Sequence, residues 1–300
     1  MELSGLHLLL TYQCTLECEH CFVWGSPWQS GTLTLENLRQ ILEQAGELGS
    51  VRSFYFEGGE PFLYYALLVE GVRMATGLGF STGIVSNGYW ATSVEDARTW
   101  LKPFAGLIQD LSISSDLYHW DEKLSRHAEH ARCAAEELDI PVGVISIAQP
   151  EARDARPAAG MLPANESKVM FRGRASQVLV GRVSQQPWMQ FTQCPYEDLR
   201  DPGRVHLDPF GNVHICQGIS LGNLFSETLA AICAAYDPDT HPILGPLLTG
   251  GPVELARRYN LPHGEGYADA CHLCYEMRTE LRERFPEILA PDAMYGGNGD

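Results

Sequence analysis

The chain has 300 residues, of which 45% are hydrophobic, enough to bury a large core in one large or two modest domains. It carries 38 acidic and 21 basic residues, a net charge of −17, and its lysines form no cluster. Because phosphates are bound by concentrated lysine and arginine, nucleic-acid and anionic-membrane partners are disfavoured. No long apolar stretch and no signal-like N-terminus is present, so we expect a cytoplasmic protein.

Apolar, β-branched runs alternate with segments of helical periodicity. Strands are predicted over 6–12, 51–56, 80–86, 107–114 and 141–148, and helices over 34–48, 63–78, 94–102 and 122–138. Thr34 is the predicted N-cap of the first helix. A sixth strand is predicted over 168–172, after a loop rich in proline and alanine. This alternation predicts the α/β class, with helices outside a parallel sheet that forms a partial (β/α)6 TIM-like barrel.

Three cysteines, Cys14, Cys18 and Cys21, follow the first predicted strand with C-x3-C-x2-C spacing. An ordinary [4Fe–4S] cluster or zinc site takes four protein ligands, so three thiolates would leave one iron open to another molecule. Without a signal peptide, such spacing favours metal binding in a reducing compartment over disulfides. A zinc site with His20 as fourth ligand is the alternative, although His20 and Cys21 are adjacent and do not easily face one metal.

A second motif, Glu57-Gly58-Gly59-Glu60-Pro61, follows the second predicted strand. Paired glycines allow a sharp turn with positive φ and a close approach of the backbone to a ligand. Glu60 places a carboxylate at that turn, suited to an ammonium group. A plain turn is the alternative when the pair is taken alone, but the cysteine cluster about forty residues earlier favours a ligand site.

With these two motifs, the first 190 residues or so resemble the radical S-adenosylmethionine (SAM) superfamily. The resemblance implies that Cys14, Cys18 and Cys21 hold a [4Fe–4S] cluster whose free iron binds the methionine amine and carboxylate of SAM. It also implies that His20 lies against the adenine and that the segment from Gly58 to Pro61 binds the methionine amine. The implied chemistry is reductive cleavage of SAM to a 5′-deoxyadenosyl radical, which abstracts a hydrogen atom from the substrate.

Further candidates follow the third and fourth predicted strands, where the site of a β/α barrel lies. Asn87 follows the third strand, and Ser114 and Asp116 follow the fourth. The resemblance implies that Ser114 and Asp116 lie near the SAM ribose and that Arg126 meets the SAM carboxylate. A tight turn at Asn87 and a helix cap at Asp116 are equally open readings. No catalytic acid or base is assigned, although Glu57 is one of the residues expected to face the pocket.

Four more cysteines lie beyond residue 190: Cys194, Cys216, Cys271 and Cys274. A hairpin is predicted over 205–215 and a helix over 227–236. The set suits zinc or a [4Fe–4S] cluster. The segment from Gly211 to Cys216 is similar to the shortened twitch form of the SPASM domain, which implies one auxiliary [4Fe–4S] cluster. The spacing also resembles that of inosamine dehydrogenases, which implies oxidation of a small alcohol or sugar.

The expected organisation is a radical SAM partial barrel over 1–190, a twitch-like auxiliary cluster domain over 191–285 and a disordered tail over 286–300. The expected protein is a radical SAM oxidoreductase with SAM and two [4Fe–4S] clusters, supplied with electrons by a donor such as flavodoxin or ferredoxin. Two alternatives stay open: a maturase that forms thioether or C–C bonds in a ribosomally made peptide, and a non-catalytic iron–sulfur or zinc redox protein.

Overall fold

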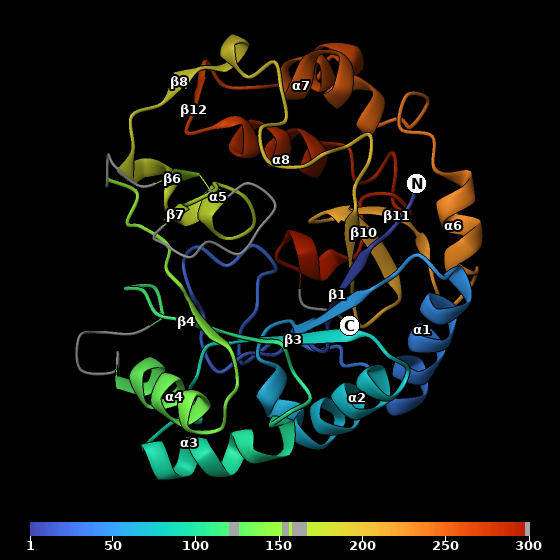
Figure 1. The fold of residues 1–300 in the computed structure, drawn as a ribbon. Coiled ribbons are helices and arrows are strands. Elements are labelled where there is room, and N and C mark those ends of the chain that lie inside the picture. The colour runs from blue at the N-terminus through green and yellow to red at the C-terminus, as the bar shows by residue number, and fades with distance from the viewer. Residues whose placement is uncertain (120–125, 152–155, 158–166, 298–300) are drawn as a thin grey trace.

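The computed structural model describes residues 1–119, 126–151, 156–157 and 167–297 (Figure 1). An eight-stranded sheet in the order β11-β10-β9-β1-β2-β3-β4-β5 organises the molecule. Its strands β1 to β5 pair in parallel with their neighbours. They are β1 (Gly5–Leu9), β2 (Ser53–Glu57), β3 (Ser81–Ser86), β4 (Asp110–Ser114) and β5 (Val142–Ile145).

Alternation of side chains along the strands separates a core from a cavity. Leu6 and Leu8 of β1 are buried in the main hydrophobic core, together with Phe54 of β2. Their neighbour His7 points to the opposite face of the sheet, because successive strand residues alternate, and it lines a cavity there. One face of the sheet is therefore built for stability and the other for binding.

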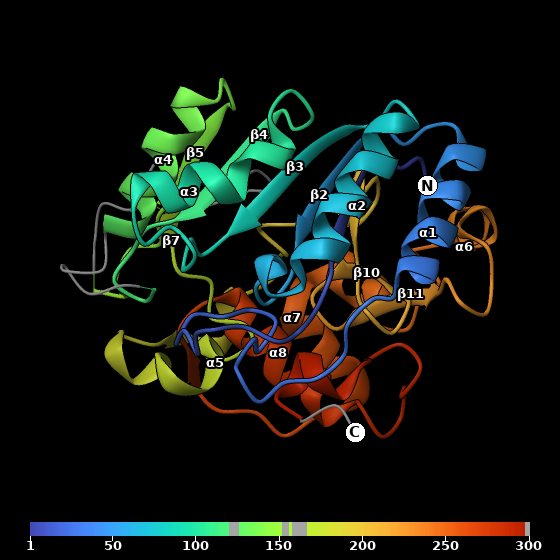
Figure 2. The ribbon, with the colours of Figure 1, turned by 90° about the horizontal axis from the view of Figure 1, so that it is seen from below.

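Helices cover the core side of β1 to β5, as Figure 2 shows. They are α1 (Leu35–Leu48), α2 (Tyr65–Gly77), α3 (Val94–Leu101) and α4 (Arg126–Glu137). Thr34 caps α1 as predicted, since its hydroxyl oxygen accepts a 3.1 Å hydrogen bond from the Asn37 backbone N–H. The predicted α/β partial barrel is confirmed; residues 122–125 of its fourth predicted helix lie outside the described residues.

The predicted sixth strand over 168–172 was mostly wrong. Only β7 (Ser167–Lys168) is a strand, and it pairs in parallel with β6 (Arg156–Pro157). Ser167 also forms an isolated parallel bridge with Ile147, just beyond β5. The following residues leave the sheet because their backbone binds other partners: the Phe171 N–H donates to the Asp269 carboxylate at 3.2 Å. This departure carries the chain toward the C-terminal cysteines.

The C-terminal part extends the barrel sheet instead of forming a separate one. Strand β9 (Arg204–Leu207) pairs in parallel with β1 and antiparallel with β10 (Asn212–Cys216). The predicted hairpin is thus present, and β11 (Ile219–Asn223), which the sequence did not predict, pairs with β10 at the sheet edge. The expected domain boundary at 190/191 therefore falls between parts that share one sheet.

The remaining elements complete the C-terminal part. The predicted helix over 227–236 is α6 (Leu229–Ala235). Two further helical segments not predicted from the sequence, α7, which kinks at Gly250-Gly251, and α8, lie on the face of the sheet opposite α1 to α4 (Figure 2). Bounds of the others are α5 (Ala175–Val178), α7 (Leu244–Tyr259), α8 (Ala270–Glu280), β8 (Gln186–Pro187) and β12 (Gly266–Tyr267).

The prediction of a disordered tail was wrong for residues 286–297. Leu289, Met294 and Tyr295 are buried in the second hydrophobic core. The Tyr295 hydroxyl donates a 2.7 Å hydrogen bond to the Gly218 carbonyl, which ties the tail to the loop between β10 and β11. Burial of these apolar side chains outweighs the glycine-rich composition that suggested disorder; residues 298–300 lie outside the described part of the chain.

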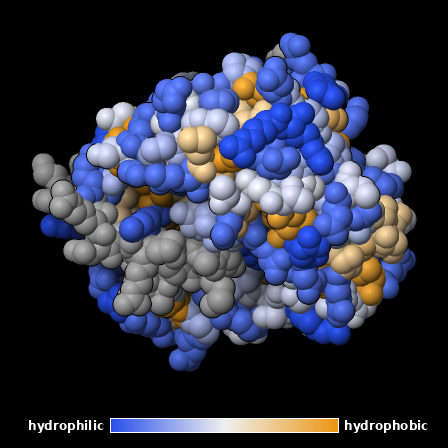
Figure 3. All heavy atoms as spheres, turned by 90° about the horizontal axis from the view of Figure 1, so that it is seen from above, coloured by the Kyte–Doolittle hydropathy of each residue, from blue (hydrophilic) through white to orange (hydrophobic). Residues whose placement is uncertain are grey.

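The surface in Figure 3 is mostly hydrophilic, and its apolar residues form small separate patches. This pattern agrees with the net charge of −17. Within the described ranges, no helix has the length and apolar composition needed to cross a membrane.

Candidate functional site

A cavity of about 270 Å³ lies where the cysteine loop meets the C-terminal ends of the parallel strands. Most residues predicted for the cofactor site line it: Cys14, Cys18, His20, Cys21, Gly58, Gly59, Asn87 and Ser114. The other predicted residues are absent from its lining: Glu60, Pro61, Asp116 and Arg126. Apolar side chains such as Leu9 and Ile147 form much of the remaining wall, as expected of a ligand pocket.

The cysteine loop is folded back by its own backbone. The Cys14 N–H donates to the Ser26 carbonyl at 3.0 Å, and the Cys21 N–H donates to the Cys18 carbonyl at 3.1 Å. Burial is the main reason why the pKa of Cys14 rises to about 12 and why that of Cys18 lies well above its usual range. The buried thiols of Cys14 and Cys18 hold their protons unless a cation compensates the thiolate charge, so this donor set fits a metal centre.

The thiols lie too far apart for a single ion. Among the described residues, two groups of three potential ligand atoms lie within 4.8 Å of one another, and neither contains a cysteine. Thiolates bound to one zinc ion at about 2.3 Å cannot lie more than about 4.6 Å apart. The wider spacing fits a multi-iron cluster, whose cysteines bind different irons. It argues against the zinc alternative with His20.

Gly58 and Gly59 let the second motif lie directly against the segment that leads to Cys14. Gly58 has φ 144°, and a Cβ on Gly59 would lie 2.1 Å from the Gln13 carbonyl oxygen. The Gly59 N–H donates to the Thr11 carbonyl at 2.7 Å. Only glycine permits this approach, so the pair fixes the cysteine loop against the end of β2.

Glu60 turns away from the cavity. Its carboxylate is fully buried and accepts hydrogen bonds from the Phe62 N–H at 3.0 Å, the Ser86 hydroxyl at 2.9 Å and the Asn87 N–H at 2.8 Å. Burial raises its pKa to about 7 despite these donors. Glu60 thus caps the turn that begins at Pro61 and joins the ends of β2 and β3. Its assignment to the SAM amine stays a prediction that these contacts do not favour.

His20 and Asp116 belong to one cluster beside the cavity. The His20 ring stacks on Tyr118 with ring centroids 4.5 Å apart, and burial lowers its pKa to about 3. Asp116 accepts a 2.7 Å hydrogen bond from His119 Nδ1 and a 3.1 Å hydrogen bond from the Ile147 N–H. The neutral His20 ring lies in the cavity wall, whereas the Asp116 carboxylate braces the loops after β4 and β5.

Asn87, Ser114 and Arg126 have different environments. The Asn87 side-chain amide donates to Thr15 Oγ1 at 3.0 Å and contacts Cys14 Sγ at 3.5 Å, so it supports the cysteine loop. Ser114 ends β4 at the cavity wall. Arg126 is exposed in the first turn of α4. The structure therefore does not place Arg126 where it would meet the SAM carboxylate.

Gly173 and Arg174 were missed from the sequence. The Gly173 backbone has φ +59°, and a Cβ there would lie 2.6 Å from the Cys21 carbonyl oxygen. The Arg174 guanidinium donates to the carbonyls of Cys18, Trp24 and Gly25 at 2.7, 3.1 and 2.9 Å. These residues lie about 150 positions after the loop they hold, so no local pattern connects them with it.

The four C-terminal cysteines line one small pocket between β10 and α8. Cys271 and Cys274 lie in the first turns of α8, whose N-cap Asp269 accepts a hydrogen bond from the His272 N–H at 2.7 Å. Arg172 and Arg278 also line this pocket. Two buried guanidinium groups beside four thiols supply positive charge that compensates an anionic cluster. The structure brings together all of the cysteines predicted for the auxiliary site.

The two sites are neighbours. Arg172, Tyr196 and Glu197 line both the large cavity and the small cysteine pocket. The Arg172 guanidinium lies 3.5 Å from Cys216 Sγ and 3.3 Å from the Glu197 carboxylate. A ligand in the cavity is therefore separated from the C-terminal cysteines by single side chains.

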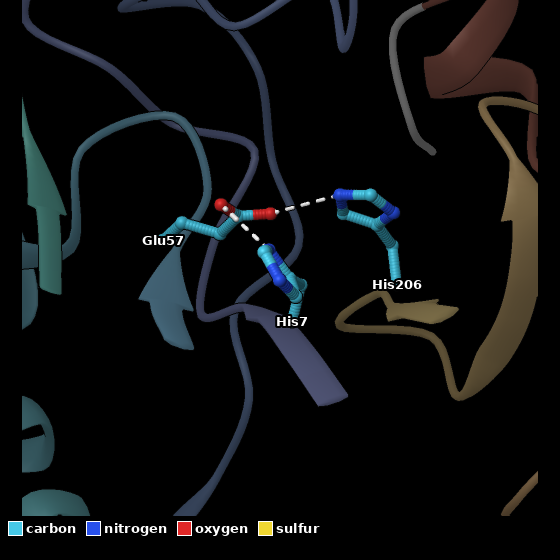
Figure 4. A group of neighbouring side chains, drawn as sticks. All are labelled: His7, Glu57 and His206. Carbon is cyan, nitrogen blue, oxygen red and sulfur yellow. Dashed lines mark hydrogen bonds and ion pairs between the residues drawn. The ribbon is translucent and has the colours of Figure 1, made fainter. Parts of the chain in front are cut away.

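A histidine and glutamate group on the sheet side of the cavity was only partly foreseen. Glu57, expected to face the pocket, lies between His7 and His206, as Figure 4 shows. Neither His7 nor His206 was assigned to this cavity from the sequence, because β1 and β9 become neighbours only in the folded sheet.

Comparisons with known proteins agree with this site. Residues 8–134 match the Radical SAM superfamily. YydG of Bacillus subtilis (strain 168), named for peptide biosynthesis, is 27% identical over 111 residues, which cover 37% of this chain and 35% of YydG. The chain therefore spans about a third of the length of that curated relative.

Two solved structures share the fold at 15% sequence identity. One is native anSMEcpe with bound AdoMet and Cp18Cys peptide, with a TM-score of 0.51 over 95% of this chain and 98% of that chain. The other is BtrN in complex with AdoMet and 2-DOIA, with a TM-score of 0.50 over 77% of this chain and 82% of that chain. The superfamily match over residues 8–134, together with the cysteine loop and the parallel barrel sheet, identifies this part of the chain as a radical SAM domain, which implies a [4Fe–4S] cluster and SAM as cofactors.

Proposed function

We propose that the protein is a radical SAM oxidoreductase that abstracts a hydrogen atom from a substrate held in the 270 Å³ cavity. The observation that carries this proposal is the convergence of the cysteine loop, His20 and the Gly58-Gly59 turn on that cavity. Reductive cleavage of SAM to a 5′-deoxyadenosyl radical is the chemistry that the cluster and SAM supply when bound.

The chain's own residues position and enclose the reactants. Arg174 holds the cysteine loop through three backbone carbonyls, and the glycine pair holds the same loop against β2. Apolar residues from β1, β3 and β5 exclude water from the cavity, which protects a radical from side reactions. The neutral ring of His20 offers a flat surface for the adenine, in line with the family resemblance.

A second [4Fe–4S] cluster at Cys194, Cys216, Cys271 and Cys274 is part of the proposal. Four thiolates leave no iron open, so this cluster relays electrons or supports the fold and does not bind substrate. Arg172 lines both the cysteine pocket and the cavity, so the two sites are neighbours. This proximity favours transfer of an electron from a substrate radical to the auxiliary cluster. A donor such as flavodoxin or ferredoxin supplies the electron for the first step.

The substrate class has two candidates. A cavity of only about 270 Å³ favours a small alcohol or sugar. A side chain of a ribosomally made peptide is the second candidate, supported by the name of YydG and by the peptide bound to anSMEcpe. The superfamily match and the shared cavity both argue against a non-catalytic redox protein.

Anaerobic reconstitution with iron and sulfide, followed by a dithionite and SAM assay for 5′-deoxyadenosine, tests the proposal. Wild type should bind about eight irons, four for each cluster. Cys18→Ala should abolish 5′-deoxyadenosine formation, and Cys271→Ala should halve the iron content. Cys133→Ala, on α4 and outside both cysteine sites, is the matched control and should behave as wild type. Iron binding without SAM cleavage by wild type would refute the enzymatic proposal.

A further inference from the structure

His7, Glu57 and His206 form a compact group in the cavity wall, separate from the cysteine loop. His7 lies on β1, Glu57 ends β2 and His206 lies on β9, directly beside His7 in the parallel register. All three line the cavity, and Figure 4 shows both imidazole rings directed at the carboxylate of Glu57. We propose that these three side chains bind one zinc ion.

The separations of the ligand atoms fit one ion. His7 Nδ1 lies 3.4 Å from Glu57 Oε2, and His206 Nε2 lies 3.2 Å from Glu57 Oε1. Nitrogen and oxygen ligands about 2.1 Å from one metal are roughly 3.0 Å apart at a right angle and roughly 3.4 Å apart at the tetrahedral angle. Charge-assisted hydrogen bonds between such groups are usually shorter, at about 2.7–2.9 Å. The group therefore has the spacing of a coordination shell.

One oxygen of the Glu57 carboxylate lacks a hydrogen-bond donor within the described part of the chain. Glu57 Oε1 is buried and, among the described residues, accepts no hydrogen bond, although His206 lies within ion-pair distance. The Glu57 side chain is only 11% exposed. A buried carboxylate oxygen without a donor is costly, and a bound cation removes that cost.

The second compact group, His20, Asp116 and His119, differs in the hydrogen bonding of its carboxylate. Asp116 lies between His20 and His119, but both of its oxygens accept hydrogen bonds, from His119 Nδ1 and from the Ile147 N–H among others. The carboxylate of that group is therefore satisfied without an ion, although His20 Nδ1 is buried without a hydrogen-bond partner among the described residues. It serves as a matched control, because it also combines two histidines with one carboxylate and borders the same cavity.

Neighbouring rings hold the two histidines in place. His7 stacks on Tyr55 with ring centroids 5.0 Å apart, and His206 meets Phe22 edge to face at 6.2 Å. Two imidazoles and one carboxylate are a common donor set for catalytic zinc and for non-haem iron, and leave coordination positions free. Since the group faces the cavity, those positions would be open to an oxygen atom of a substrate.

Zinc analysis of the reconstituted holoenzyme tests the site. The protein is incubated with Zn²⁺ under anaerobic conditions, dialysed and analysed for zinc and iron. Wild type should retain one zinc per chain, with an X-ray absorption shell of nitrogen and oxygen at about 2.0–2.1 Å and no sulfur at about 2.3 Å. Glu57→Gln and His206→Ala should bind zinc at least tenfold more weakly, with unchanged iron content as the sign of a folded protein.

The control variant His119→Ala should retain its zinc. Failure of wild type to retain zinc, a sulfur shell, or equal retention in Glu57→Gln and His206→Ala would each overturn the site. These outcomes are independent of the proposed activity, because 5′-deoxyadenosine formation and its loss in Cys18→Ala are measured without zinc.

Discussion

The guanidinium of Arg174 donates a 2.7 Å hydrogen bond to the backbone carbonyl of Cys18, 156 residues earlier in the chain. Two further bonds from the same group reach the carbonyls of Trp24 and Gly25, and the Arg174 N–H donates to the Cys21 carbonyl at 3.0 Å. One buried side chain therefore connects the segment after β7 with the loop that presents the cysteines. The shape of the cluster site depends on it.

Replacing Arg174 by alanine should disrupt the cysteine loop. Three buried carbonyls would lose a charged donor, and such bonds contribute roughly 1.5–3 kcal/mol each. We expect Arg174→Ala to lower the free energy of unfolding by at least about 3 kcal/mol and to reduce the iron content of the first cluster. Thermal unfolding and iron analysis measure both effects. Arg182→Ala, whose partners are surface carboxylates of Glu19 and Glu151, should cost less than about 1 kcal/mol.

Gly59→Ala should prevent close packing of the second motif on the cysteine loop. The new Cβ would lie 2.1 Å from the Gln13 carbonyl oxygen, so the backbone would have to move. We expect a loss of roughly 3 kcal/mol or more in stability, at the upper end of overpacking costs. Gly77→Ala is the control, because a Cβ on that α2 residue meets no atom within 4 Å. It should be neutral or slightly stabilising in urea titrations; equal effects of both substitutions would contradict the steric argument.

Asp208 should make the protein sensitive to acid. Burial alone would raise its pKa, but hydrogen bonds from His214 and Asn212 outweigh burial and lower it. The carboxylate also accepts a 2.9 Å hydrogen bond from the Tyr12 hydroxyl. Because the folded-state pKa of Asp208 is depressed, its ionised carboxylate stabilises the fold fully at pH values above the aspartate pKa of the unfolded chain, about 3.9. This stabilisation is lost as the pH falls through the folded-state pKa.

Urea titrations between pH 7 and pH 3 test this expectation. The free energy of unfolding of wild type should fall most steeply below about pH 4. Asp208→Asn should be less stable at pH 7, and its free energy of unfolding should depend less on pH. Asp239→Asn, at an exposed aspartate paired with Arg200, should keep the wild-type pH dependence. An Asp208→Asn profile parallel to wild type would show that another group controls the acid transition.

Arg172 should raise the reduction potential of the proposed auxiliary cluster. Its buried guanidinium lies 3.5 Å from Cys216 Sγ, and a cation beside a cluster favours the more negative, reduced state. Arg172→Gln should lower the potential by roughly 60 mV, which is a tenfold change in a one-electron equilibrium. A redox titration followed by electron paramagnetic resonance, in a Cys18→Ala background, isolates this cluster. Arg200→Gln, at an exposed ion pair, should leave the potential unchanged.

The sequence determined the local features of this protein. Strand and helix alternation predicted the parallel sheet, and Thr34 was recognised as a helix cap because capping depends on three neighbouring residues. The C-x3-C-x2-C spacing placed three thiols on one loop, and Gly58-Gly59 marked a turn that no larger residue tolerates. Each of these signals arises from steric or hydrogen-bonding rules that act over a few residues.

Only the tertiary structure decided which distant residues meet. Glu60 lies at the turn that its motif predicted, yet donors from Ser86 and Asn87 turn its carboxyl group away from the cavity. His7 and His206 become neighbours only because β9 pairs with β1, and Arg174 reaches Cys18 only because the chain leaves the sheet after β7. Such contacts depend on long-range packing and on the burial of charge, which the order of residues along the chain does not display.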